Sequence, residues 1–498
     1  MHNCIKLLIL VISICKRSFS TEICKPKVAI IGGGIGGASA SHYLTDLFKN
    51  NLKIDLFEPI KLGGRLATIE IGENEYEAGG SVIHPRNKYM QYFVKLLGLE
   101  KKDPGGSSIS GIWNGEKFVF TESKWEIVTL TKMIYRYGFQ PIKLNRYVNW
   151  ILDNFDKIYD FHESGVAFEN VSSLLYALNH DFPGLLNISL KDHLHNLEFS
   201  TLSIDELAEA TLVVNYNQET NVHSFVGLVS IAGAGSDLWS IKGGNKKVPE
   251  NLIRRNNLVK VIPSGVEKIR LVLKNENSLQ YELFYRNKVT GNPDFVSDFY
   301  DIVIIATPLT VDQEYPIKFE EFPPETLFHF PGKYQTTVAT FVHANLNTFH
   351  FGLEDEIDAV YSCNPNFTNI SSVGKVDSVS EPKKGTLKTW KVFTKENMTP
   401  AFMNKIFSQV GDFKVKSWKA AYPRYSTENR FDRFKLQEGL YHVNAIEWAA
   451  SAMEMSAIGG RNVAILAYKD FTKKCSSYET ERKTEKAHSS ELKSTSKL

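Results

Sequence analysis

The sequence predicts an α/β fold that combines a buried parallel sheet with a second, mixed α+β region. The first observation is the stretch VAIIGGGIGGASASHYL at 28–44, where a short β-branched run leads through glycines into small, helix-compatible residues. The second is the strand-like stretch LKIDLFE at 52–58, and the third is the fully apolar run at 302–305. Such runs are typical of strands buried on both faces of a parallel sheet.

The first glycine turn has the spacing of a Rossmann-type dinucleotide site. Gly32 allows a tight turn, Gly34 lets the backbone approach a pyrophosphate, and Gly37 lets the helix pack closely on the strand. The following helix would direct its positive end at the phosphates. Glu58 comes 21 residues after Gly37, at the end of the next strand, where its carboxylate can accept hydrogen bonds from ribose hydroxyls. NAD and FAD both fit these residues.

The residues after Glu58 favour FAD. The stretch PIKLGGRLAT supplies a second glycine turn with Gly64 and Arg65, and YEAGGSVIHP supplies a third with Gly79 and Gly80. This order resembles the FAD-binding signature of the amine-oxidase-like flavoproteins. The resemblance implies that the GGR segment lies along the cofactor phosphates, with Arg65 reaching one of them, and that the third turn lies near the isoalloxazine ring.

Two later segments are similar to further parts of that signature. The run at 302–305 ends in Ala-Thr-Pro, which resembles the second flavoprotein motif and assigns Thr307 to the cofactor. The stretch at 439–471 reads as a strand, a turn that contains Glu447, and a small-residue helix. In the resembled flavoproteins this helix directs its N-terminus at the pyrimidine side of the flavin. An ordinary amphipathic core helix is the alternative.

Two narrower motifs resemble the prenylcysteine oxidase family, with similarity from Lys27 to Phe471. They are LWSIKGGN, which contains Gly243 and Gly244, and EWAASAMEMSAI. The resemblance implies a lysosomal, glycosylated FAD oxidase that cleaves the thioether of farnesyl- or geranylgeranyl-cysteine to an aldehyde, cysteine and hydrogen peroxide. The alternatives are a flavin amine oxidase and a non-catalytic secreted member of the same family.

The resemblance and the turns together give a set of expected cofactor-binding residues. No resident metal is predicted, and the FAD is expected to be non-covalent because no Cys or His stands in a recognised flavin-linking context. The expected cofactor residues are Gly32, Gly34, Gly37, Glu58, Gly64, Arg65, Gly79, Gly80, Gly243, Gly244, Thr307 and Glu447.

Catalytic side chains are harder to predict. A thioether oxidation needs no nucleophile from the protein, because the flavin takes the electrons and the chain only has to position the substrate and exclude water. His84, just after the third turn, is a weak acid–base candidate, and a structural histidine is the alternative. His193 and His195 could be a metal pair on a strand, but a surface pair is favoured.

The cofactor motifs are scattered, so the sequence predicts a discontinuous FAD-binding domain. We expect it to comprise 26–90, 231–308 and 436–472, with a substrate domain at 91–230 and 309–435. Within the substrate domain, VSSLLYALNHDF reads as a helix and TTVATFVHANL as a strand. The charged tail, 473–498, is low in apolar residues and is predicted to be disordered.

The first 20 residues predict a secretory signal peptide, with a basic residue before a short apolar run and small residues before the cut. No other stretch predicts a membrane span, and a net charge of +2 gives no sign of nucleic-acid binding.

The expected partners are a small prenylcysteine substrate and molecular oxygen. Pairing among Cys24, Cys363 and Cys475 is left open. Five N-x-S/T sequons predict glycosylation at Asn170, Asn187, Asn366, Asn369 and Asn397.

Overall fold

The computed structural model describes 25–102, 108–234, 237–275, 278–286, 295–310, 312–324, 326, 328–381, 388–428 and 430–495. Side chains at 274, 275 and 278 and from 477 onward lie outside that description. The predicted signal peptide and Cys24 also lie outside the described residues. Cys363 carries a free thiol, and Cys475 is disulfide-bonded.

A six-stranded sheet carries the first glycine turn. Its order is β22-β23-β13-β1-β2-β9, and every neighbouring pair is parallel except β22 with β23. The strands are β1 (Lys27–Ile31), β2 (Lys53–Phe57), β9 (Val259–Ile262), β13 (Ile302–Ile305), β22 (Lys435–Gln437) and β23 (Leu440–His442). The predicted α/β class is therefore confirmed.

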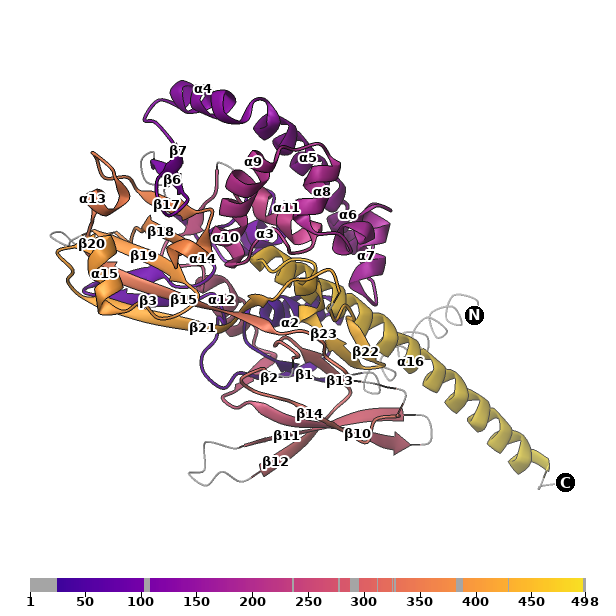
Figure 1. Ribbon diagram of the computed structural model, residues 1–498. Coiled ribbons are helices and arrows are strands. Elements are labelled where there is room, and N and C mark those ends of the chain that lie inside the picture. Colours follow the sequence, from indigo (N-terminus) through magenta and orange to yellow (C-terminus); the bar gives the residue numbers. More distant parts are fainter. Residues whose placement is uncertain are drawn as a thin grey trace, which may run out of the picture.

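Both faces of this sheet are buried, which explains its uninterrupted apolar runs. On β1, Val28 and Ile30 pack toward the helices, whereas Ala29 and Ile31 pack toward a second, four-stranded sheet. That sheet has the order β12-β11-β10-β14 and lies below the parallel sheet in Figure 1. Its strands are β10 (Val266–Asn275), β11 (Ser278–Arg286), β12 (Phe295–Tyr300) and β14 (Lys318–Glu320).

Helices α2 (Ile35–Leu47) and α16 (Met453–Thr495) lie side by side on the other face. Their backbones approach closely, because a Cβ added at Gly460 would stand 2.6 Å from the carbonyl oxygen of Gly36. The Ser39 hydroxyl also donates to the Ala457 carbonyl at 2.7 Å. Small residues therefore bring the first helix of the chain against its last one.

A seven-stranded sheet and a layer of helices form the rest of the fold. The order of the sheet is β21-β15-β19-β18-β17-β6-β7, and Figure 1 shows the helices from α3 to α11 gathered beside it and above α2. Its strands are β6 (Ser110–Trp113), β7 (Phe118–Thr121), β15 (Tyr334–His343), β17 (Ala359–Ser362), β18 (Ser372–Lys375), β19 (Thr389–Thr394) and β21 (Phe413–Pro423).

The remaining elements are short, apart from the helices of that layer. The layer contains α3 (Lys88–Leu96), α4 (Glu126–Tyr137), α5 (Gln140–Phe155), α6 (Lys157–Glu163), α7 (Val171–Leu178), η1 (Phe182–Leu186), α8 (Leu190–Asn196), α9 (Thr201–Ser203), η2 (Ile204–Ala208), α10 (Glu209–Tyr216) and α11 (Ser224–Ala232). Elsewhere lie β3 (Thr68–Ile71), β4 (Asn74–Glu77), β5 (Lys101–Lys102), β8 (Ser240–Ile241), α12 (Lys247–Arg254), β16 (Asn345–Leu346), α13 (Thr348–Phe351), α14 (Pro365–Thr368), α15 (Pro400–Ile406), β20 (Phe407–Ser408) and η3 (Val443–Trp448).

The sheets can be set beside the predicted domain segments, although the domain division itself stays a prediction. The predicted helix and strand in the substrate region are confirmed as α7 and β15. The strands of the six-stranded sheet fall in the three predicted cofactor segments, except that β22 begins one residue earlier, and all seven strands of the larger sheet fall in the other two segments. Two strand pairings cross the predicted segments: β14 lies beyond 309 but pairs with β10, and β5 lies before 230 but pairs with β8.

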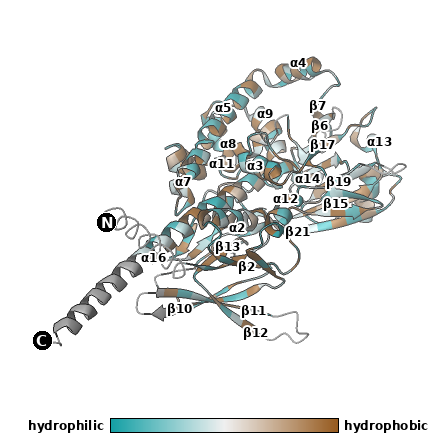
Figure 2. Cartoon of the chain, turned by 180° about the vertical axis from the view of Figure 1, so that it is seen from behind, coloured by the Kyte–Doolittle hydropathy of each residue, from teal (hydrophilic) through white to brown (hydrophobic). Residues whose placement is uncertain are grey.

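The predicted disorder of the tail is not what the structure shows. Helix α16 continues to Thr495, and Figure 1 shows it leaving the body of the protein, whereas Figure 2 shows its first part beside α2. The stretch from 473 to 495 contains no Pro and no Gly, so nothing in it ends a helix that has already begun. Low apolar content explains why the extension projects outward, but it does not prevent helix formation. None of the described helices is long and apolar enough to cross a bilayer.

Candidate functional site

The first glycine turn connects β1 to α2, and two of its glycines are required by the fold itself. Gly32 has φ +111°, and a Cβ there would stand 2.7 Å from the carbonyl oxygen of Ala306. A Cβ at Gly37 would stand 2.1 Å from the Gly32 carbonyl oxygen. The predicted roles of these residues in turning the chain and in packing the helix on the strand are therefore visible in the structure.

Gly34 differs, because nothing in the protein requires a glycine there. Its φ of −79° suits any residue, and an added Cβ would meet only the Gly63 carbonyl oxygen at 3.8 Å and the Gly64 Cα at 3.9 Å. Gly34 is also the N-cap of α2, with no side-chain cap and no acidic residue in the first turn. The open space beside Gly34 thus faces the unpaired N–H groups of a helix N-terminus, which is a suitable place for a phosphate.

The second glycine turn packs directly on the first. Gly63 and Gly64 have φ of +112° and +58°, and the Gly63 N–H donates to the Gly33 carbonyl at 2.9 Å. Gly34 and Gly63 form a parallel bridge. A Cβ on Gly64 would stand 3.2 Å from the Gly34 Cα. The two turns therefore leave room for a bound group only if neither position carries a side chain.

Two polar side chains border this cradle. Glu58, half-buried just beyond β2, accepts hydrogen bonds from the Gly33 and Ile60 N–H groups, both at 3.0 Å, and its carboxylate keeps lone pairs for further donors. Thr307 follows β13 and lies against Gly32, 2.9 Å from where a Cβ there would stand. Its Oγ1 is buried and has no hydrogen-bond partner among the residues that the structure describes. A bound group with polar atoms would supply that partner.

Arg65 and Glu447 are brought together by the fold. The guanidinium forms an ion pair with the Glu447 carboxylate and also donates to the Ala421 carbonyl at 2.9 Å. Glu447 is fully buried and additionally accepts from the hydroxyl of Tyr334 and the amide of Asn444, both at 2.9 Å. The structure therefore places the Arg65 side chain on Glu447, and its contact with a phosphate stays a prediction.

The electrostatics of this pair follow from burial. Burial alone would lower the pKa of Arg65, but the facing Glu447 charge outweighs it, and the pKa lies above its usual value. Burial, together with the same carboxylate, raises the pKa of Tyr334 well above its usual value. Both groups therefore keep their protons at any physiological pH.

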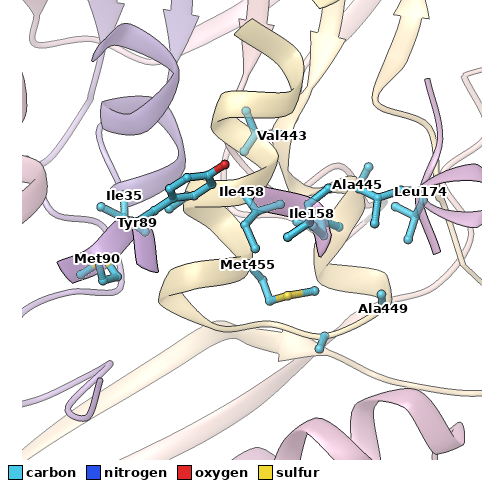
Figure 3. Close-up of a cluster of buried hydrophobic side chains, with 14 of the residues drawn as sticks. Ile35, Tyr89, Met90, Ile158, Leu174, Val443, Ala445, Ala449, Met455 and Ile458 are labelled. Atoms are coloured by element: carbon cyan, nitrogen blue, oxygen red, sulfur yellow. The ribbon is translucent and has the colours of Figure 1, made fainter. Parts of the chain in front are cut away.

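The third glycine turn is held by the second. A Cβ on Gly79 would stand 1.9 Å from the Arg65 carbonyl oxygen, to which the Gly80 N–H donates at 3.1 Å. The start of α16 is also close, because a Cβ on Gly80 would lie 3.5 Å from Met453 Cγ. A Cβ on Gly36 would lie 3.5 Å from the Ser456 carbonyl oxygen, so the N-termini of α2 and α16 lie together. Ile35 of α2 and Met455 and Ile458 of α16 belong to the buried cluster shown in Figure 3.

The GGN motif is hydrogen-bonded to the third turn through its asparagine. Gly243 and Gly244 have φ of +83° and +97°, so the turn itself needs glycine. The buried Asn245 then donates its side-chain amide to the Gly80 carbonyl at 3.0 Å and its backbone N–H to the Glu77 carboxylate at 2.6 Å. The motif therefore reaches the third turn through Asn245, and a contact of Gly243 or Gly244 with a cofactor stays a prediction.

A buried lysine that sequence reasoning missed lies under the same turn. Lys391, on β19, is only 6% exposed, and its ammonium donates to the Glu77 carbonyl at 3.0 Å. Burial lowers the pKa of Lys391 to about 8 and raises the pKa of the Glu77 carboxyl to about 7. A lone lysine in a strand carries no local pattern, so no sequence signal marked it.

The histidine candidates have structural partners. His84 Nδ1 accepts from the Arg86 N–H at 3.1 Å and so supports the turn before α3, while burial lowers its pKa. His193 lies on a helix, α8, rather than on a strand, and bonds the Tyr147 hydroxyl at 2.8 Å. Within the described ranges no cluster of potential ligands could hold a metal ion.

The sequons differ in exposure. Asn170 is half-buried, and its side chain caps α7 by accepting from the Ser173 N–H at 2.7 Å. The other four side chains face solvent, as glycosylation would require; they are Asn187, Asn366, Asn369 and Asn397.

The residues fit a flavin dinucleotide. The cradle at Gly34 and Gly64 leaves room for a pyrophosphate, Glu58 can accept from a ribose, and Thr307, whose buried hydroxyl has no partner among the described residues, packs its methyl group against the first turn. Among solved structures, cyclohexylamine oxidase from Brevibacterium oxydans IH-35A has a TM-score of 0.58, with 15% identity over 89% of this chain and 99% of that one. The chain therefore has the fold of the flavin amine oxidases.

The sequence comparisons identify the family of this chain within that fold class. A family model described as NAD(P)-binding Rossmann-like domain matches residues 30–97, and the Prenylcysteine lyase model matches residues 120–480. Prenylcysteine oxidase 1 from Bos taurus is 42% identical over 89% of this chain and 88% of its own length. Prenylcysteine oxidase 1-like from Bos taurus is 34% identical over 89% and 90%. The chain belongs to the prenylcysteine lyase family.

The openness around Gly34 predicts that Gly34→Ala folds but does not hold FAD. A methyl group fits the protein, yet it occupies the space that the cradle leaves for the cofactor. Flavin absorbance per protein should fall to background, while the circular dichroism spectrum stays that of the wild type. Gly374→Ala is the matched control, since a Cβ there meets no atom within 4 Å. Full flavin occupancy in Gly34→Ala would show that the space has another use.

The Glu77 carboxyl predicts a pH dependence of stability. Burial raises its pKa from 4.5 to about 7, so between those values the folded state binds a proton that the unfolded state has released. The contribution of Glu77 to stability is therefore fully present below about pH 4.5 and is lost as the pH rises to about 7. Glu77→Gln should remove this loss, seen as a smaller fall in Tm across that interval. Glu70→Gln, at an exposed position, should follow the wild type; parallel curves for all three proteins would contradict the assignment.

Proposed function

We propose that this chain is an FAD-dependent oxidase that cleaves the thioether of farnesyl- or geranylgeranyl-cysteine. The observation that carries the proposal is the 42% identity to Prenylcysteine oxidase 1 across 89% of the chain, which spans the cofactor turns and the seven-stranded sheet alike. The cradle at Gly34 supports the cofactor part of the proposal, because it leaves room that only a bound group would use.

The reaction balances with one water and one O₂. The carbon between the prenyl chain and sulfur loses two electrons and a proton, and a water oxygen adds to that carbon. The carbon–sulfur bond then breaks to give the prenyl aldehyde and the cysteine thiol, while O₂ leaves as hydrogen peroxide. FAD, when bound, supplies the chemistry of a two-electron acceptor that O₂ reoxidises.

The residues of this chain act by binding and positioning. We assign Gly34, Gly64 and the N-terminus of α2 to the pyrophosphate, Glu58 to a ribose and Thr307 to a polar atom of the cofactor. The Arg65–Glu447 pair fixes the second turn relative to α16. None of these groups exchanges a proton with the substrate, in keeping with a reaction whose electrons leave through the cofactor.

We further propose that 26–90, 231–308 and 436–472 form the FAD-binding domain and that 91–230 and 309–435 form the substrate side. The agreement of these segments with the two large sheets supports the division.

A route through the secretory pathway to the lysosome is supported by the leader-like first 20 residues and by four exposed sequons. Peroxide formation inside such a compartment would keep the product away from the cytosol.

The proposed cofactor linkage is non-covalent. Cys363 stands at the end of β17, outside the glycine turns, and His84 uses Nδ1 to hold the Arg86 N–H. Acid precipitation of the purified protein should therefore release the yellow colour into the supernatant. Colour that stays with the pellet would establish a covalent bond.

The substrate proposal is tested with matched thioethers. Farnesylcysteine should produce peroxide and aldehyde in equal amounts, because each thioether that is cleaved consumes one O₂. The reaction should be fast, because loss of hydride next to sulfur leaves a cation shared with the alkene. A saturated S-alkyl cysteine of equal length lacks that delocalisation and should turn over far more slowly. Its affinity should be similar, because a chain of equal length gains the same burial free energy of about 0.8 kcal/mol per CH₂. Equal rates for the two would contradict allylic oxidation, and peroxide from a polyamine alone would establish an amine oxidase.

A further inference from the structure

Helices α4 and α5 expose apolar side chains that no part of the protein covers among the described residues. Within α4 only Tyr137 is buried. Trp125 is 72% exposed, Ile127 74%, Tyr135 93% and Phe139 72%. Single exposed apolar residues are ordinary, but several large ones on two consecutive helices are unusual and indicate an interaction surface. We call this group the α4–α5 face; it comprises Trp125, Ile127, Leu130, Tyr135, Phe139 and Ile142.

An apolar groove runs between the two helices of this face. Leu130 and Ile134 line it from α4, Pro141 and Ile142 line it from α5, and Gly138 forms the turn between them. The lining is apolar apart from Asn145. A groove of this kind is suited to a hydrocarbon chain rather than to a polar ligand.

The charges around the α4–α5 face are almost all positive. Between residues 124 and 146 the sequence has five basic residues and one acidic residue, although the whole chain has a net charge of only +2. Arg136 is ion-paired with Glu206, and the other basic side chains are exposed: Lys124, Lys132, Lys143 and Arg146. Lys132 and Lys143 donate to the backbone carbonyls of Thr121 and Leu197, so their charges have no carboxylate partner among the described residues. Aromatic and aliphatic side chains ringed by lysine and arginine are typical of an element that lies in the interface of an anionic bilayer.

We propose that the α4–α5 face docks on the surface of an anionic lipid bilayer. Trp125, Ile127 and Phe139 would enter the headgroup region, and the surrounding lysines would meet lipid phosphates and carboxylates. The proposal goes beyond the proposed reaction, since it concerns where the protein sits and not what it oxidises. Its measurement needs neither substrate nor turnover, so it fails or succeeds separately from the proposed function.

The position of the face in the fold supports a planar partner. Figure 1 shows α4 at the outer end of the helical layer, far from the four-stranded sheet. The C-terminal part of α16 projects in another direction, so the tail of the chain does not cover α4. Two-fold pairing of this face with a second copy would bring two sets of positive charge together, which disfavours a dimer.

The test measures binding of the full-length protein to sedimented vesicles. We expect binding to phosphatidylcholine vesicles that contain about 30 mol% phosphatidylserine, weaker binding to pure phosphatidylcholine, and loss of binding as salt rises. The double variant Ile127→Ser/Phe139→Ser should bind at least about tenfold more weakly, because it loses the buried apolar area. Lys132→Glu should reduce binding about fivefold or more.

Two variants on the opposite side of the protein are matched controls. Leu273→Ser replaces a leucine on β10 that is 73% exposed, and Lys318→Glu reverses an exposed charge on β14. Both should bind vesicles like the wild type. The proposal is overturned if the wild-type protein ignores anionic vesicles, or if Leu273→Ser loses as much binding as the double variant. A dimer in solution that the double variant separates, with no vesicle binding, would assign the face to a second copy. Unchanged FAD content of each variant would show that it is folded.

Discussion

The ion pair between Arg65 and Glu447 is the interaction on which the geometry of the site depends. It joins the second glycine turn to the segment that precedes α16, across 382 positions of sequence. Through the Tyr334 hydroxyl the same carboxylate is tied to β15 of the seven-stranded sheet. Removing one partner of a buried pair typically costs about 3–5 kcal/mol, because the remaining charge is left without compensation. Three parts of the molecule are thereby held in one arrangement.

Around that pair, the site is built as a series of backbone contacts. The first turn supports the second through Gly33 and Gly63, the second supports the third through the Arg65 carbonyl, and Asn245 closes the series at Gly80. Side chains would obstruct most of these contacts, which is why glycine recurs. The reason for glycine differs between positions, however. At Gly37 a side chain would collide with the backbone of the protein, whereas at Gly34 a side chain would enter a space that the described residues leave open.

Local pattern explains what could be predicted from the sequence. The strand–turn–helix order around Gly34 and the acidic residue after β2 are short-range features, so the buried sheet and the cradle followed from them. Contacts between distant segments were not predictable. Lys391 and Tyr334 lie on ordinary strands, and only the folded chain brings them to Glu77 and Glu447. Composition failed at the tail, because a low apolar content predicts that a segment will not pack and says little about whether it is helical.

The order of strands in the six-stranded sheet also constrains how the protein is made. The first strand begins at Lys27, but the sheet is completed only by β23, which ends at His442, and α16 follows later still. At about 5–20 residues per second a ribosome needs roughly 20–80 s to make that interval. Until then the edge of β13 that pairs with β23, and the side of α2 that packs on α16, have no native partner. The nascent chain therefore presents a binding site for chaperones, and it can take up its cofactor only after translation is nearly finished.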